Sequence, residues 1–172
     1  DTPATSLTHA AGIILSGGPK STIGTDALSC DPGIFSLGTS ILGLCYGHQL
    51  LAKHFGGTVT KGESREYGIA SLSLTASPLF HTLPAVSTVW MSHGDYVSTL
   101  PPGFVQIAST GNESIAAMAH EEKKIYGLQF HPEVAHTDHG QQMLSNFIFD
   151  ICGAKKNWTS ASMLDALQTE IL

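Results

Sequence analysis

In Gly43-Leu44-Cys45-Tyr46-Gly47, a cysteine stands between two glycines where one pattern of hydrophobic residues gives way to another. The apolar run 39–44 predicts a short buried strand, and residues 46–55 predict an amphipathic helix that ends at the glycine pair 56–57. A Gly-x-nucleophile-x-Gly turn between strand and helix is typical of a nucleophile elbow, here with cysteine in place of serine. The helix N-terminus would favour the thiolate of Cys45, the form that attacks carbonyl carbons. A buried structural cysteine is the alternative, and the flanking glycines favour the nucleophile.

A histidine that could serve this cysteine follows a second predicted strand. Residues 124–130 have a strand pattern that ends in His131-Pro132-Glu133, where the proline stops the strand. In an extended segment His131 and Glu133 point to the same side, so the carboxylate can hold the imidazole edge that faces away from the sulfur. By itself the motif also fits a surface turn. Together with the elbow, it predicts a Cys45-His131-Glu133 set at the carboxyl ends of two strands of one sheet.

A third apolar run, residues 11–15, predicts another buried strand and is followed by Ser16-Gly17-Gly18-Pro19. The glycine pair can turn a backbone N–H toward a substrate oxygen. We therefore expect the N–H groups of Gly18 and Tyr46 to form an oxyanion hole, although Gly-Gly-Pro is also a common plain turn.

These segments resemble the motifs of the class I (triad) glutamine amidotransferases, and residues 16–19, 43–49 and 130–133 carry the resemblance. It extends over nearly the whole chain, and its details resemble the amidotransferase domains of GMP synthases. One residue departs from that pattern, since GMP synthases often have Met where this chain has His48. The further segments that carry this finer resemblance are Arg65-Glu66-Tyr67-Gly68, Val89 to Asp95, Tyr126 to Thr137, Gly140 with Met143-Leu144, Asp150-Ile151-Cys152 and Trp158-Thr159.

The resemblance implies an α/β fold with an open, mixed, largely parallel sheet and flanking helices, similar to flavodoxin. Members normally begin with a strand-helix unit that precedes anything seen here, so we expect this unit to be lacking. Residues 1–152 would form the amidotransferase domain, and residues 153–172 a linker and helix leading toward a synthetase domain. The strands expected in the middle, antiparallel or mixed, are 69–75, 88–91, 105–109, 115–119 and 125–130, followed by a helix over 140–152.

The resemblance also implies a reaction. Cys45 would attack the side-chain amide of L-glutamine, with His131 moving protons and Glu133 orienting it. The ammonia would pass to an ATP-pyrophosphatase (synthetase) domain that converts XMP to GMP. ATP and Mg²⁺ are expected on that domain only, so no cofactor is expected in this chain. The amino-acid end of glutamine would contact Gln49, Ser92, Gly94 and Asp95.

Composition excludes several other classes of function. The chain has 172 residues, a net charge of −6 and only eight Lys and Arg, so no basic stripe suits a nucleic acid. No apolar run approaches the roughly 20 residues of a membrane span. An odd number of cysteines, three, argues against a disulfide framework and predicts a reducing compartment, so we expect a cytoplasmic protein.

The remaining candidates have ordinary explanations. His131, His136 and His139 lie near Asp138, but their spacing is not a regular ligand pattern, and we expect no metal site. His93 looks like a second catalytic histidine but is better explained as support for the 92–95 loop. Two rival functions stay open: a γ-glutamyl cysteine hydrolase of the same fold, and a regulatory pseudo-amidotransferase without activity.

Overall fold

The structure is a computed structural model that describes residues 2–111 and 115–156. The predicted final helix, with Trp158 and Thr159, lies outside the described residues. The described elements, in chain order, are η1 (Ala4–Leu7), β1 (Gly12–Leu15), η2 (Pro32–Ser36), β2 (Ser40–Leu44), α1 (Tyr46–His54), β3 (Thr58–Leu74), η3 (Pro78–Phe80), β4 (Val86–Thr99), β5 (Val105–Thr110), β6 (Ile115–His120), β7 (Ile125–Leu128), α2 (Gly140–Ser145) and η4 (Asn146–Ile151).

The strands form one seven-stranded sheet in the order β1-β2-β7-β6-β5-β3-β4. The predicted mixed sheet is confirmed, but the expectation that it is largely parallel is wrong. Only β1-β2 and β2-β7 pair in parallel. The other four pairings are antiparallel. Three of them, β3-β4, β5-β6 and β6-β7, join strands that follow one another in the chain, with connections too short for a helical crossover.

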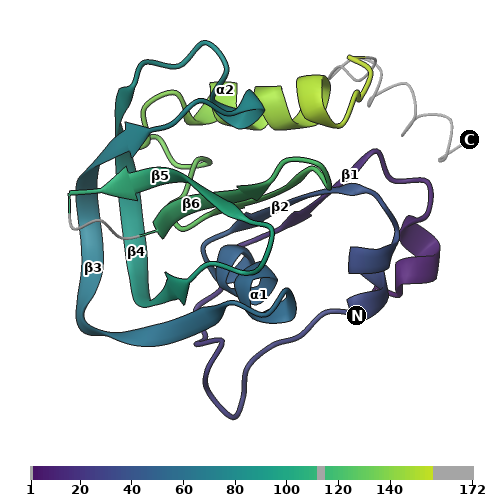
Figure 1. The fold of residues 1–172 in the computed structure, drawn as a ribbon, viewed down its shortest axis with the longest axis horizontal. Helices are drawn as coiled ribbons and strands as arrows, with labels where there is room; N and C mark the ends of the chain where they lie inside the picture. Colours follow the sequence, from purple (N-terminus) through teal and green to yellow (C-terminus); the bar gives the residue numbers. More distant parts are fainter. Residues whose placement is uncertain (1, 112–114, 157–172) are drawn as a thin grey trace, which may run out of the picture.

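Two strands of the parallel part, β2 and β7, lie at the buried centre of the molecule. Every residue of β2 and β7 is buried, as expected for strands covered on both faces. Helix α1 covers one face, and α2 with η4 covers the other (Figure 1). The core residues of the two helices include Leu51 and Ala52 on α1, and Met143 and Phe147 on the other side.

The antiparallel part is dominated by β3 and β4, which form the long ribbon at one side of Figure 1. Both strands are much longer than the predicted segments 69–75 and 88–91. Their pairing is interrupted once in the middle: Lys61 pairs with Asp95 and Glu66 pairs with His93, so residues 62–65 stand opposite Gly94 alone. This bulge brings an irregular segment of the hairpin beside the elbow, because Gly62 and Gly94 line the same pocket as Cys45.

The helices match their predicted positions. Helix α1 ends in a Schellman motif, in which the N–H of Gly57 donates to Ala52 at 2.7 Å and Gly56 takes a φ of +89°. The predicted helix 140–152 is observed as α2 followed directly by η4, which is π-helical. Within the described ranges, no helix is both long enough and apolar enough to cross a membrane.

Candidate active site

The turn between β2 and α1 has the geometry of a nucleophile elbow. Cys45 has a φ of 49°, unusual for a residue with a side chain, and its N–H donates to Leu128 on β7 at 2.7 Å. The glycines on either side are required by close backbone contacts. A Cβ on Gly43 would lie 2.5 Å from the carbonyl carbon of Gly47, and one on Gly47 would lie 2.2 Å from the carbonyl oxygen of Leu15. The expected strand-elbow-helix unit is confirmed.

His131 and Glu133 lie together as the sequence predicts. The Nδ1 atom of His131 is 2.7 Å from Oε1 of Glu133. The pKa of His131 is raised to about 9, chiefly by the nearby sulfur of Cys45 and further by Glu133, while burial opposes the shift. At neutral pH the imidazole is therefore protonated, and a positive charge beside the sulfur favours the thiolate.

The 16–19 loop closes the site from the β1 side. A Cβ on Gly17 would lie 3.0 Å from Cε1 of His131 and 3.6 Å from Cβ of Cys45, so a side chain at this position would crowd both residues. Gly18 packs against the ring of Tyr46, at 3.7 Å from a constructed Cβ to Cγ. Tyr46 is the first residue of α1, where backbone N–H groups have no acceptor within the helix. The two N–H groups expected to form an oxyanion hole thus belong to residues that lie side by side in space.

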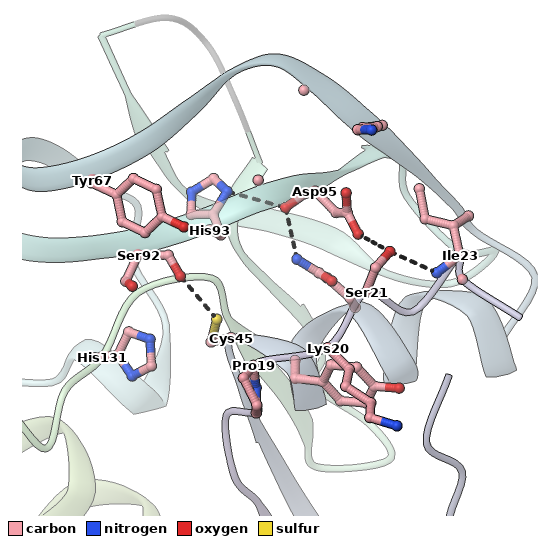
Figure 2. A pocket seen from close by; sticks show the side chains of 17 residues that line it. Pro19, Lys20, Ser21, Ile23, Cys45, Tyr67, Ser92, His93, Asp95 and His131 are labelled. Atoms are coloured by element: carbon pink, nitrogen blue, oxygen red, sulfur yellow. Dashed lines mark hydrogen bonds between the residues drawn. The ribbon is translucent and has the colours of Figure 1, made fainter. Parts of the chain in front are cut away.

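A single pocket of about 980 Å³ unites the predicted residues (Figure 2). Glu133 is the one predicted site residue that does not line it, since it lies behind His131. The hydroxyl of Ser21 also lines the pocket and donates to the Asp95 carboxylate. The predicted residues on its wall are Gly18, Cys45, Tyr46, Gln49, Ser92, Gly94, Asp95 and His131.

Sequence reasoning missed Gln129. Its side chain is 2% exposed, and its Nε2 lies 3.9 Å from the sulfur of Cys45. Its Oε1 accepts from Nε2 of Gln49 at 3.2 Å, and that same nitrogen donates to the carbonyl of Asp95 at 2.7 Å. The available signal was a polar residue inside the apolar run 125–130, one position before the strand reaches Phe130.

His93 supports the hairpin as expected. Its Nδ1 lies 3.1 Å from the carbonyl oxygen of Asp95, and its Nε2 lies 3.2 Å from Oε2 of Glu66. Burial lowers the pKa of His93, against the opposing effect of Glu66. The side chain is 7% exposed, so it is part of the wall of the pocket and not a free surface group.

The other cysteines and histidines have different settings. Cys30 and Cys152 are free thiols, and burial raises the pKa of each. The ring of His136 packs against that of Trp90, with a centroid distance of 5.0 Å and an interplanar angle of 39°. Among residues 2–111 and 115–156, no three His, Cys, Asp or Glu side chains gather in a way that could hold a metal ion.

Comparisons with known proteins identify the family of this chain. Residues 1–151 match the family described as Glutamine amidotransferase class-I. The chain is 49% identical over 155 residues to GMP synthase [glutamine-hydrolyzing] of Bacillus cytotoxicus, covering 90% of this chain and 30% of that protein. The same enzyme of Geobacillus kaustophilus is 49% identical over 158 residues, covering 91% and 31%. The chain thus spans about a third of the length of these relatives.

Two solved structures share the fold. A protein from Thermoplasma acidophilum, described as one subunit of a GMP synthase, superposes with a TM-score of 0.77 at 34% identity, covering 87% of this chain and 76% of that one. A glutamine amidotransferase from Thermotoga maritima gives a TM-score of 0.62 at 22% identity, covering 94% and 66%. At that identity the second match supports the fold alone.

Proposed function

Because this chain belongs to the class-I glutamine amidotransferases, we propose that it is the glutamine-hydrolysing part of a GMP synthase. The observation that carries the proposal is the arrangement of Cys45, His131 and Glu133, which lie in that order from the start of α1 outward. The similarity to glutamine-hydrolysing GMP synthases supports the choice of substrate.

In the proposed first half-reaction, the thiolate of Cys45 attacks the side-chain amide carbon of glutamine. A C–S bond forms, and negative charge develops on the amide oxygen, toward which the N–H groups of Gly18 and Tyr46 would point. Losing one such donor typically costs on the order of a hundredfold or more in rate. His131, protonated at neutral pH, gives its proton to the leaving nitrogen as the C–N bond breaks, and ammonia departs.

In the second half-reaction, neutral His131 takes a proton from water, which attacks the γ-glutamyl thioester. The C–S bond breaks, the thiolate of Cys45 returns and glutamate leaves, so one glutamine and one water yield one glutamate and one ammonia. Glu133 would hold the imidazole in orientation through Nδ1, which leaves the other ring nitrogen for proton transfer.

The bulged hairpin would hold the amino-acid end of the substrate. Ser92, Gly94 and Asp95 lie on the wall opposite the elbow, where backbone groups and a carboxylate can bind an α-amino and an α-carboxylate group. Gln49 also lines the pocket, although its amide already bonds to Asp95 and Gln129. Its contact with glutamine remains part of the proposal.

The proposal also includes a partner domain and a cellular location. The ammonia would pass to a synthetase domain that aminates XMP in purine biosynthesis, and ATP and Mg²⁺ would bind there. None of the three cysteines forms a disulfide, as a reducing cytoplasm would allow.

A labelling and turnover experiment tests the proposal. A glutamine analogue with an electrophilic side chain should label Cys45 stoichiometrically and leave Cys30 and Cys152 unmodified, as read by peptide mass spectrometry. Wild-type chain should release glutamate from glutamine, and Cys45→Ala should not. Labelling of Cys30 instead, or turnover by Cys45→Ala, would overturn it. Hydrolysis of γ-glutamyl peptides in preference to glutamine would indicate the hydrolase alternative, and binding without turnover the regulatory one.

A further inference from the structure

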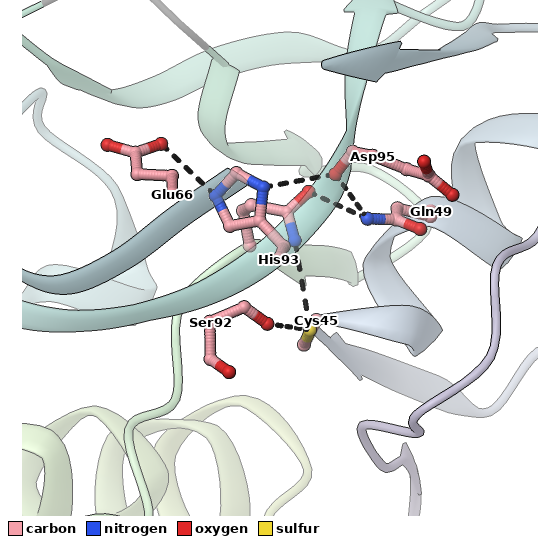
Figure 3. A network of polar contacts seen from close by, with 7 residues as sticks. Cys45, Gln49, Glu66, Ser92, His93 and Asp95 are labelled. Atoms are coloured by element: carbon pink, nitrogen blue, oxygen red, sulfur yellow. Dashed lines mark hydrogen bonds and ion pairs between the residues drawn. The ribbon is translucent and has the colours of Figure 1, made fainter. Parts of the chain in front are cut away.

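A chain of buried amides runs behind the pocket and ends on the sulfur of Cys45 (Figure 3). Both amides belong to nearly fully buried side chains: Gln129 is 2% exposed and Gln49 is 4% exposed. Buried amides are costly unless they are hydrogen-bonded, so two of them in contact point to a role beyond packing.

The direction of this chain is fixed by the group at its far end. The carbonyl oxygen of Asp95 can only accept, so the atom of Gln49 at 2.7 Å from it must be the NH₂ group. The same NH₂ group faces Gln129 at 3.2 Å, which makes the facing atom of Gln129 its oxygen. The remaining end of the Gln129 amide, its NH₂ group, is therefore the one directed at the sulfur.

Two groups then compete at the sulfur. The carbonyl oxygen of Ser92 lies 3.7 Å away and can only accept, so it stabilises the thiol S–H. The N–H of Gln129 can only donate, so it stabilises the thiolate. Ionisation, with the proton moving to His131, weakens the first contact and strengthens the second.

We propose that Gln129 is a catalytic residue that donates a hydrogen bond to the thiolate of Cys45, and that Gln49 and His93 are positioning residues that orient its amide through the Asp95 carbonyl. The proposal rests on Cys45 being the nucleophile of the proposed function. Gln129 does not line the pocket, so its contribution concerns the sulfur and not the binding of substrate.

His93 holds the far end of this series of hydrogen-bonded amides, at the Asp95 carbonyl. Because the Asp95 carbonyl only accepts, the Nδ1 atom of His93 carries a proton, and two donors then hold this carbonyl. The other ring nitrogen of His93 faces Glu66 on β3, so the series of amides is linked to the bulged hairpin. The position of the Asp95 carbonyl is thus set by both α1 and β3.

The test measures the alkylation of Cys45 by iodoacetamide as a function of pH, with peptide mass spectrometry separating it from Cys30 and Cys152. In Gln129→Leu, the loss of one hydrogen bond to a charged group should raise the pH midpoint by about one unit, or tenfold in thiolate population. The glutaminase kcat at pH 7 should fall, with KM within about twofold of wild type. The titratable and charged groups around the sulfur are unchanged in this variant; they are Lys20, Tyr46, Lys61, Tyr67, His93, Asp95 and His131.

Two further variants complete the design. Gln129→Glu keeps the volume and the acceptor for Gln49 but turns an oxygen toward the sulfur, so it should raise the midpoint further. It decides the question if Gln129→Leu does not fold, as judged by thermal melting. The matched control is Gln106→Leu, since the Gln106 amide bonds to the carbonyl of its own strand neighbour Ala108, and its midpoint should equal that of wild type.

A midpoint that stays within about 0.3 units of wild type in folded Gln129→Leu, or that does not rise in folded Gln129→Glu, would overturn the proposal. Alkylation needs no glutamine. A wild-type chain without glutaminase activity would therefore refute the proposed function, while the alkylation midpoints still decide the role of Gln129.

Discussion

The two halves of the sheet hold the pocket by different means. On the parallel side, backbone touches backbone, and the elbow fits only because Gly43 and Gly47 have no Cβ. On the antiparallel side, the hairpin tolerates an interruption of four residues opposite Gly94, and side chains such as Glu66 and His93 close the gap. The nucleophile is thus placed by rigid close packing, whereas the opposite wall is placed by adjustable polar contacts.

The largest expected effect comes from adding a methyl group to the rigid half. In Gly47→Ala the new Cβ would meet the Leu15 carbonyl oxygen at 2.2 Å, so β1 and α1 must separate. We expect a loss of about 3 kcal/mol in the free energy of unfolding, measured in urea, and loss of glutaminase activity. The control is Gly111→Ala, whose Cβ would meet nothing within 4 Å. Equal losses in the two variants would contradict the close-packing account.

The next effect separates proton transfer from orientation. His131→Ala should reduce kcat by about 10³–10⁴-fold, because it removes the group that protonates the leaving nitrogen. Glu133→Gln should reduce kcat by only about 10–100-fold, because a water can replace a carboxylate that is 46% exposed.

The pH profile gives a second readout for the same pair. Glu133 contributes to the raised pKa of His131, so Glu133→Gln should lose its alkaline activity at a lower pH than wild type. Removing Cys45 and His131 together should cost little more than removing Cys45 alone, as for groups that act as one unit. Losses that multiply would separate their roles.

A third prediction concerns His48, which is fully buried under the elbow against Gly127. Burial lowers the pKa of His48 to about 3, so it stays neutral in the folded state while the unfolded chain binds a proton below about 6.5. Stability should therefore fall as pH drops from about 6.5 toward 3, by up to a few kcal/mol.

His48→Met should remove this part of the pH dependence, since Met fills a similar volume without a titratable group. The measurement is the urea midpoint at pH 7 and pH 5. The exposed His9→Met serves as the control and should keep the wild-type difference. An unchanged difference between the two pH values in His48→Met would show that another group causes it.

The smallest effect is expected in the adjustable half. Glu66→Gln removes the charge from a contact whose carboxylate is 33% exposed, so KM for glutamine should change at most about fivefold, with little change in kcat. The exposed Glu122→Gln is the control. A large fall in kcat would show that the hairpin is as rigidly coupled to the nucleophile as the elbow is.

The same contrast explains what could be predicted from the sequence. The elbow is a local pattern, because the glycines, the cysteine and the helix they require lie within a few residues of one another. The link from His131 to Glu133 is equally local. The pairing of Glu66 with His93 depends on the register of two long strands, and no short motif records it.

The role of Gln129 could not be predicted from the sequence either. A glutamine near the end of an apolar strand is compatible with either face, and only the fold shows that it meets Gln49 from α1. Likewise, the lengths of the antiparallel strands were underestimated, because the polar segment 61–66 has none of the β-branched and aromatic residues that mark strands.

The backbone bond from Cys45 to Leu128 has a consequence for how the site assembles. Cys45 and His131 are far apart in the chain, and they meet because Leu44 is aligned with Leu128 across two parallel strands. A slip of one residue would move the histidine by about 3.3 Å along the strand and turn its side chain to the other face. Such a misfolded molecule would keep nearly the same secondary structure, and circular dichroism would not distinguish it. Catalytic activity therefore reports whether the two strands are correctly aligned. The active fraction of a refolded sample measures the fraction of correctly aligned molecules.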